Sequence, residues 1–321
     1  MTQEQDISKL DLLFTEIDTY RSSKFFKRLI EFCARFKTLA PYNAMLVRFQ
    51  MPGARYVLTS AEWRSRYNRG VKAKARPLII LVPFGPVNFV FDIKDTYPLS
   101  PDDPNTTEQI LKTMENPYAT HGEFNRQYLH FLENNLQYHG IAYNPNWETG
   151  STVAGELKPL PNSSEYMKVY IPFRKGEFSV QSKAHYVLST SSDGHDGQTL
   201  ATIAHELGHL FCNHLPAPKG WKHAWTERDI ESDAKEYEAE VVSWFICDRL
   251  GIKTPSHEYL SGFLKSNDEI PKGASVERIF YAITKVWEMC NNVNFSYRNG
   301  LLYKNDEKFQ DDVKATIEKY K

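Results

Sequence analysis

Residues 204–210 read Ala-His-Glu-Leu-Gly-His-Leu, so His205 and His209 stand four positions apart and Glu206 follows the first of them. In an α-helix, positions i and i+4 lie on one face, which lets both imidazoles point at the same place. Most neighbouring residues are apolar or small, and a buried histidine or glutamate without a partner is costly. The pattern is typical of a helix on which two histidines hold Zn²⁺ and the glutamate acts as general base.

A third protein ligand is expected, because catalytic zinc keeps three protein ligands and leaves the fourth position for water. The next helical pattern carries Glu236, Glu238 and Glu240. Glu236 and Glu240 share a helix face, whereas Glu238 points about 200° away from Glu236. We predict that Glu236 is the ligand and that Glu240 orients a liganding histidine through its other ring nitrogen. Two alternatives stay open: Glu238 as the ligand, or a solvated acidic run without any ligand.

Residues 205–209 and 236–240 together resemble the two motifs of the ImmA/IrrE metallopeptidases, and the spacing between them suits that family. The chain departs from the second motif at Glu240, where Asn or Asp is usual, at Val242, where Phe is usual, and at Ser243, where Ala is usual. The resemblance implies a zincin-like domain and a gluzincin-like zinc endopeptidase. It also leaves open a regulator of the ImmA type, which cleaves a repressor.

Several other residues could serve such a site. His214 lies five residues after His209, about 140° off the ligand face of a continuing helix, so we do not expect it to bind the metal. Cys212 is more simply a small buried hydrophobic residue. The sequence does not choose among four candidates for stabilising an oxyanion, namely His195, His223, Tyr237 and Arg228.

The composition is that of a globular protein. The chain has 321 residues, of which 41% are hydrophobic and 25% are charged, enough for two domains. No apolar run approaches the roughly 18 residues of a membrane span, and the first residues lack the order of a signal peptide. The cysteines are too few for a disulfide framework: Cys33, Cys212, Cys247 and Cys290. We therefore expect a cytoplasmic protein without a membrane partner.

Charge is unevenly distributed along the chain. Residues 20–80 contain 14 Lys or Arg and only two acidic residues, Glu31 and Glu62, although the whole chain has a net charge of −1. Such a basic block favours a polyanionic partner. The cations that could neutralise phosphates are Arg55, Arg64, Arg66, Arg69, Lys72, Lys74 and Arg76. The aromatic residues that could stack on unpaired bases are Tyr42, Phe49, Tyr56, Trp63 and Tyr67. The alternative is a solvated basic surface over an aromatic core.

The same region resembles the N-terminal domain of ArdC-type antirestriction proteins, over about residues 20–92. The resemblance rests on Tyr42, Asn43, Leu46, Gln50, Trp63, Arg69, Val71 and Lys72. It implies binding of single-stranded DNA and a role in shielding incoming plasmid or phage DNA from restriction. In that role the zinc site could be structural and proteolysis not central.

Taken together, the patterns predict an α+β protein with two domains. A small basic domain of helices and a hairpin occupies residues 1–100, a linker residues 101–120, and the metallopeptidase domain residues 121–321. The hairpin is expected from the apolar runs 78–82 and 87–91, and two later strands from residues 166–172 and 185–189. The strand over 185–189 precedes the zinc helix, where it would line the cleft and pair with an extended substrate.

Overall fold

The computed structural model describes residues 23–320 apart from residues 37–38, 83–86, 101–105, 116–124, 148–153, 162–164, 175, 192–194, 253–269 and 292–294. Helices and strands both contribute substantially, so the predicted α+β class is confirmed. The chain divides into a smaller unit, residues 24–123, and a larger unit that runs from residue 124 to the C-terminus. None of the helices in the described ranges is both long and apolar enough to cross a membrane.

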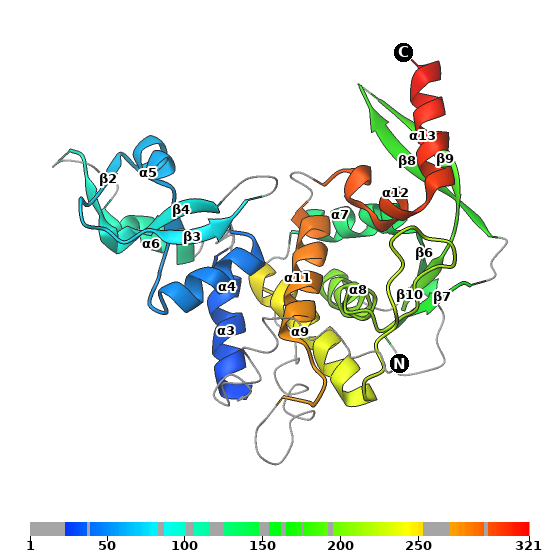
Figure 1. Ribbon diagram of the computed structural model, residues 1–321, viewed down its shortest axis with the longest axis horizontal. Coiled ribbons are helices and arrows are strands. Elements are labelled where there is room, and N and C mark those ends of the chain that lie inside the picture. The colour runs from blue at the N-terminus through cyan, green and yellow to red at the C-terminus, as the bar shows by residue number, and fades with distance from the viewer. Residues whose placement is uncertain are drawn as a thin grey trace, which may run out of the picture. The chain divides into compact units, whose positions relative to one another are not determined.

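The smaller unit combines short helices with antiparallel strands (Figure 1). Its helices are α3 (Ser23–Arg35), α4 (Pro41–Gln50), α5 (Ser60–Tyr67), α6 (Thr107–Glu115) and the 3₁₀ turn η1 (Ile93–Asp95). Its strands are β1 (Val57–Leu58), β2 (Arg69–Val71), β3 (Leu78–Leu81), β4 (Val87–Asp92) and β5 (Thr96–Pro98). One sheet has the order β1-β4-β3, and β2 pairs with β5. The predicted hairpin is confirmed, with Leu78 opposite Val90 and Leu81 opposite Val87.

A helix covers the outer edge of this hairpin. The side-chain amide of Asn43 bonds both the N–H and the C=O of Leu81, at 3.0 and 2.9 Å. Gln50 does the same to Ile79, with 2.8 Å for each bond. The two amides stand seven positions apart on α4, about two turns, so they lie on one face of the helix, and Ile79 and Leu81 are two residues apart on β3, so their backbone groups point to the same edge. They therefore satisfy backbone groups that an edge strand would otherwise present to solvent.

The core of the smaller unit is aromatic and extends into the predicted linker. Trp63 is fully buried and donates its indole N–H to the carbonyl oxygen of Phe91, at 2.8 Å. Tyr56 packs edge-on against Trp63, with 5.5 Å between ring centroids. Ile110 and Leu111 of α6 belong to the same cluster. The linker prediction is therefore wrong for residues 107–115, because this segment forms a helix whose apolar face packs in the smaller unit. The other parts of the predicted linker, residues 101–105 and 116–120, lie outside the described ranges.

The larger unit begins with α7 (Gln127–Leu136), the 3₁₀ turn η2 (Gln137–His139) and five strands. The strands are β6 (Ile141–Trp147), β7 (Gly155–Pro159), β8 (Tyr166–Phe173), β9 (Gly176–Lys183) and β10 (Tyr186–Ser191). The helices that follow are α8 (Asp196–Phe211), α9 (Ser232–Leu250), α11 (Val276–Asn291), η3 (Tyr297–Asn299), α12 (Leu301–Asn305) and α13 (Glu307–Lys319). Figure 1 shows α8 between the strands β7 and β10 and the helices α9 and α11.

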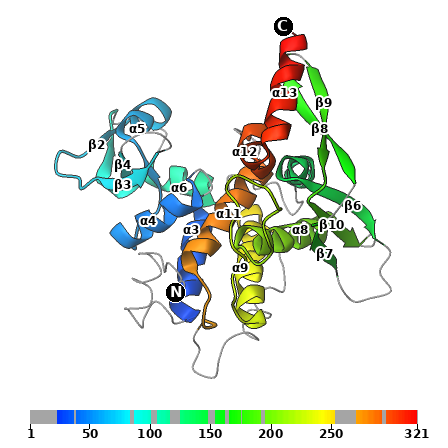
Figure 2. The same ribbon diagram turned by 45° about the vertical axis from the view of Figure 1, so that its right-hand side comes forward.

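The described residues of the larger unit form two sheets. One has the order β6-β10-β7, in which β10 runs parallel to β6 and antiparallel to β7. The other is the hairpin β8–β9, and both views show α13 alongside it (Figures 1 and 2). The strands predicted over 166–172 and 185–189 are confirmed as β8 and β10. Pairing of substrate with the second of them is wrong, because β10 already has a strand on each side. Among the described strands, β6 and β7 are the two edges of that sheet.

Candidate metal centre

Helix α8 presents the His-Glu-x-x-His motif from a well-formed frame. It begins at the N-cap His195, whose side chain accepts the Gln198 N–H. Leu200, Ile203 and Leu207 are fully buried and fix which face of the helix meets the core. The histidines at i and i+4 lie on another, partly exposed face. The apolar face thus decides where both imidazoles point.

Helix α9 approaches α8 closely at a glycine. A Cβ atom added to Gly208 would lie 2.8 Å from the Ala239 Cα and 3.2 Å from its carbonyl oxygen, so only glycine allows this separation. The Ser243 hydroxyl donates to the Ala201 carbonyl oxygen at 2.8 Å and joins the same two helices. The close contact brings one face of α9 against the two histidines.

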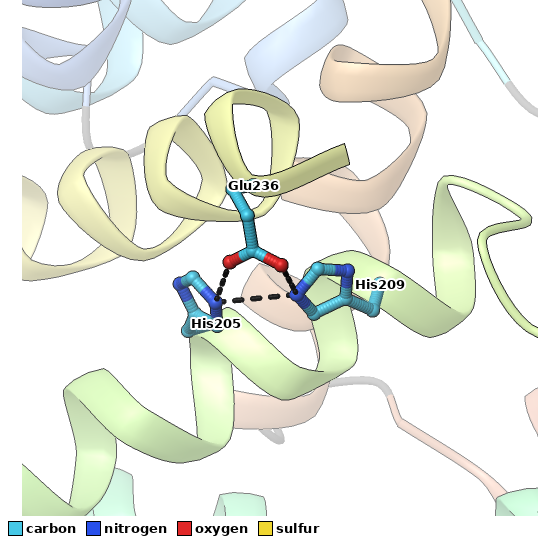
Figure 3. A group of neighbouring side chains, drawn as sticks. All are labelled: His205, His209 and Glu236. Atoms are coloured by element: carbon cyan, nitrogen blue, oxygen red, sulfur yellow. Dashed lines mark hydrogen bonds and ion pairs between the residues drawn. The ribbon is translucent and has the colours of Figure 1, made fainter. Parts of the chain in front are cut away.

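Three side chains converge between these helices (Figure 3). The Nε2 atoms of His205 and His209 are 3.2 Å apart. One carboxylate oxygen of Glu236 lies 3.4 Å from His205 Nε2, and the other lies 3.6 Å from His209 Nε2. The side chains are 22%, 15% and 42% exposed in the order His205, His209, Glu236. The group can therefore be reached from solvent.

Electrostatics tie the three groups together. Burial lowers the pKa of His205, but hydrogen bonds with Glu236 and Glu240 raise it by more, to about 10. The adjacent imidazoles, that of His205 first and that of His209 second, hold the pKa of Glu236 well below its usual range. An anionic carboxylate facing two imidazoles is a place where positive charge is stabilised.

Glu206 lies on the side of α8 that faces the sheet. One of its carboxylate oxygens accepts the backbone N–H of Leu157, from β7, at 2.9 Å. Burial raises the pKa of Glu206, and the neighbouring His205 and His209 offset part of that rise. The Leu157 N–H points away from β10, because it bonds this side chain instead of the sheet. The outer edge of β7 therefore borders the site.

Each histidine uses its second ring nitrogen differently. His205 Nδ1 lies 3.1 Å from a Glu240 oxygen, as predicted for Glu240. His209 Nδ1 lies 2.9 Å from Nδ1 of His214, whose Nε2 lies 2.7 Å from a Glu238 oxygen. Both ring nitrogens of each histidine are thus engaged.

The contacts of Glu238 exclude it as the third ligand. It is fully buried, and Arg228 donates to its two oxygens at 2.6 and 3.0 Å. The Ser275 N–H donates to the same carboxylate at 2.6 Å. The alternative of Glu238 as ligand is therefore wrong, and so is the suggestion that Arg228 awaits an oxyanion. The guanidinium also argues against a cation among Cys212, His214 and Glu238, although their ligand atoms lie within 4.8 Å of one another.

Three further candidates for stabilising an oxyanion remain, namely His195, Tyr237 and His223. His195 caps the start of α8, ten residues and about 15 Å along the helix from His205. Tyr237 is 3% exposed and lies in the core. His223 is exposed, and its backbone N–H bonds Asn305. The hydrogen bonds described for His195 and His223 lead to Gln198 and Asn305 and not to His205, His209 or Glu236.

Sequence reasoning missed His214 because it assumed that the helix continues. In the structure α8 ends at Phe211, and Asn213 adopts a left-handed φ of 62°. The turn folds the chain back, so that the His214 N–H bonds the carbonyl oxygen of His209 at 2.9 Å. Asparagine just after a helix is a known signal for such a turn. The contact of Leu157 with Glu206 had no sequence signal, since it joins residues 49 positions apart.

The predicted nucleic-acid residues of the smaller unit fall into two classes. Six of the seven cations are exposed: Arg55, Arg64, Arg66, Lys72, Lys74 and Arg76. Arg69 is 3% exposed and donates to the hydroxyls of Thr96 and Thr107, so its prediction as a phosphate ligand is wrong. The prediction of Trp63 as a stacking residue is also wrong, because its side chain is fully buried in the core. Tyr42 is half-buried.

Comparisons with known proteins add no family assignment. No family model matches the chain. Neither the curated proteins nor the solved structures with which the chain was compared gave a match. The function therefore has to be argued from the site.

Proposed function

We propose that this protein is a zinc-dependent peptidase in which His205, His209 and Glu236 hold the metal and Glu206 is the general base. The observation that carries the proposal is the spacing of the ligand atoms. Tetrahedral zinc with bonds of about 2.0–2.1 Å needs ligand atoms about 3.3–3.4 Å apart. The two Nε2 atoms are 3.2 Å apart, and each faces a different Glu236 oxygen, at 3.4 and 3.6 Å. With one ligand atom from each residue, the three atoms lie within 4.8 Å of one another, so a modest closure of the carboxylate around the ion completes the zinc spacing.

The donor set also fits zinc chemically. Two imidazoles and one carboxylate are a ligand set of catalytic zinc, and their partial exposure leaves room for water and substrate. Glu240 lies against the other ring nitrogen of His205, which fixes the ring and increases its basicity. When bound there, zinc would lower the pKa of a water and polarise a carbonyl group. These are the two requirements of amide hydrolysis.

Glu206 supplies the proton transfers. It follows His205 on α8, and the Leu157 N–H holds its carboxylate in place. A base is most effective when its pKa lies near the working pH, and burial moves the pKa of Glu206 upward in that direction. In the proposed mechanism Glu206 takes a proton from the attacking water and passes it to the leaving nitrogen.

The edge of β7 favours a peptide as substrate. Among the described strands, β7 pairs with β10 on one side only. Its outer edge carries the backbone of Leu157, which already contacts Glu206. An extended peptide that adds to this edge would pass Glu206 and the three ligands. The resemblance to ImmA/IrrE metallopeptidases, including repressor-cleaving regulators, agrees with a protein substrate.

The test compares the wild type with Glu206→Gln on a library of unstructured peptides, read by mass spectrometry. We expect cleavage to fall about 10²–10⁴-fold, since a general base contributes that much, while zinc content stays unchanged. Glu156→Gln is the matched control, because this carboxylate stands on β7 next to Leu157 and pairs with Lys158. Undiminished cleavage by Glu206→Gln would rule out its role as base, and absence of zinc from the wild type would rule out the metal centre.

We further propose that the smaller unit binds single-stranded nucleic acid, as the ArdC resemblance implies. One face of the β3–β4 hairpin exposes apolar side chains that pair across the strands, Ile79 with Phe89 and Leu81 with Val87, each 42–50% exposed. Phe89 borders a hollow of about 470 Å³ that Pro77 and Ser60 also line. Arg76 precedes Pro77, and Arg64 stands one turn beyond Ser60. An exposed aromatic ring, with arginines on the segments that line the same hollow, suits an unpaired base and its phosphates.

This second function is tested by titrating a fluorescent oligothymidine with the full chain at several salt concentrations. Phe89→Ala should weaken binding about tenfold or more, because stacking contributes about 1–3 kcal/mol per base. Removing Arg64 and Arg76 together should reduce the salt slope by about 1.4, at about 0.7 per phosphate contact. Arg126→Gln is the control, since this arginine lies in the larger unit with a side chain 79% exposed. An equal loss on Arg126→Gln would contradict the proposal.

A further inference from the structure

A row of buried polar groups leads away from one of the two histidines. His209 Nδ1 contacts His214 Nδ1 at 2.9 Å, and His214 Nε2 contacts Glu238 at 2.7 Å. The side chains of His214 and Glu238 are 1% and 0% exposed. Arg228 donates two hydrogen bonds to the Glu238 carboxylate, and it also donates to the carbonyl oxygens of Cys212 and Gly273. The row ends on a charge-balanced pair that is fixed by several backbone contacts.

The positions of the protons along this row follow from its end. Glu238 accepts two N–H groups of Arg228 and the N–H of Ser275, so it is a carboxylate without a proton to give. The Nε2 atom of His214 must therefore be the donor to Glu238. A neutral His214 then presents a bare Nδ1, which can only accept. The proton between the two Nδ1 atoms consequently belongs to His209, and His209 Nε2 keeps its lone pair.

We propose that His214, Glu238 and Arg228 form a relay that holds His209 in the Nδ1–H tautomer and aims its Nε2 lone pair at the metal. The inference rests on the proposed zinc site and assigns positioning residues to it. The opposite arrangement fails, because a donor at His214 Nδ1 would require a bare His209 Nδ1 and a proton on His209 Nε2. That proton would occupy the place where a cation binds.

The two liganding histidines are held to different degrees. At its Nδ1, His205 meets the Glu240 carboxylate, whose side chain is 16% exposed. His209 meets a neutral ring that is itself fixed by a buried, paired carboxylate. Hydrogen bonds in a dry, fully satisfied network constrain orientation more strongly than those open to water. The relay therefore makes His209 the more rigid of the two metal ligands.

The first test measures zinc affinity by competition with a chromophoric chelator. His214→Leu removes the acceptor for His209 Nδ1–H and should weaken zinc binding about 10–100-fold, the usual effect of losing such a partner. His214→Gln should restore most of the affinity, because its amide can accept from His209 and donate to Glu238. Ser243→Ala is the matched control: it removes a buried hydrogen bond between the same helices but touches no ligand.

The second test reads the tautomer directly from ¹⁵N shifts of the histidine rings in the metal-free protein, with His209 assigned by its absence in His209→Gln. We expect a protonated Nδ1 and a bare Nε2 in the wild type. A proton on His209 Nε2, or equal zinc affinity for wild type and His214→Leu, would overturn the relay while leaving the peptidase proposal intact. Failure of the wild type to bind zinc would instead remove the metal site. The ring shifts are read on the wild type, and the substituted chain serves only to assign the His209 signals.

Discussion

Both units bury charged side chains, but the buried charges of the two units differ in the groups that they contact. In the smaller unit, Asp92 is fully buried and accepts the backbone N–H groups of Arg55, Tyr56 and Lys94. Arg69 there is bonded to two threonine hydroxyls. These contacts tie loops and strands of the smaller unit together.

In the larger unit the buried pair of Glu238 and Arg228 continues through His214 to a partly exposed imidazole, that of His209. Buried charge by itself thus marks structural support as often as function. What distinguishes a site is a buried network that ends on ligand atoms open to solvent. Three predictions test this distinction, each on a different buried or half-buried group.

The largest expected effect separates two glutamates of α9. Glu238→Ala leaves Arg228 and His214 buried without their partner, which should lower the free energy of unfolding by about 3–5 kcal/mol. Glu236→Ala, at a side chain 42% exposed, should cost at most about 1 kcal/mol in the metal-free protein yet abolish zinc binding. Urea denaturation with chelator present, followed by zinc titration, measures both. Similar free energies of unfolding for Glu238→Ala and Glu236→Ala would contradict the distinction between a buried supporting carboxylate and a solvent-exposed metal ligand.

A smaller effect is expected where the helices touch. Gly208→Ala places a Cβ against the backbone of Ala239, so α8 and α9 must separate or strain. We expect a loss of about 1–3 kcal/mol in unfolding free energy, together with weaker zinc binding, because the ligands come from both helices. Gly53→Ala has no atom within 4 Å of the new Cβ and serves as the control. Zinc affinity unchanged in Gly208→Ala would show that the close contact serves packing alone.

The smallest effect concerns His139, which is buried in the larger unit but lies outside the relay. Its ring packs edge-on against Phe211, and burial lowers its pKa to about 3. The unfolded chain takes up a proton near pH 6.5 and the folded protein does not, so stability is full above pH 6.5 and is lost as the pH falls toward 3.

Between pH 7.5 and 5.5 this one group should cost about 1 kcal/mol. His139→Gln should remove that share of the pH dependence without affecting zinc affinity. Urea unfolding of both proteins at the two pH values checks it. An identical pH dependence in wild type and variant would mean that His139 does not titrate on unfolding.

Sequence patterns anticipated which side chains converge between α8 and α9 better than they anticipated which side chains of the basic unit are exposed, for a physical reason. The spacing of His205 and His209, and that of Glu236 and Glu240, acts through helix geometry, which fixes where atoms lie once the buried face is known. The prediction for residues 20–80, in contrast, rested on their composition. Composition does not say which arginine folds inward, and Arg69 and Trp63 are both interior. The contacts at His214 and Leu157 depend on a turn and on a distant strand, so local spacing could not reveal them.

The amides of Asn43 and Gln50 have a consequence for how the protein behaves at high concentration. The β3–β4 hairpin has an exposed apolar face. Hairpins of this kind tend to pair with strands of further chains along an open edge, which leads to fibrils. Here a helix imitates the missing neighbour, so an incoming chain would first have to displace four hydrogen bonds. A flat ligand can lie on the face, but a strand cannot join the edge, and the protein can keep a sticky surface without polymerising through it.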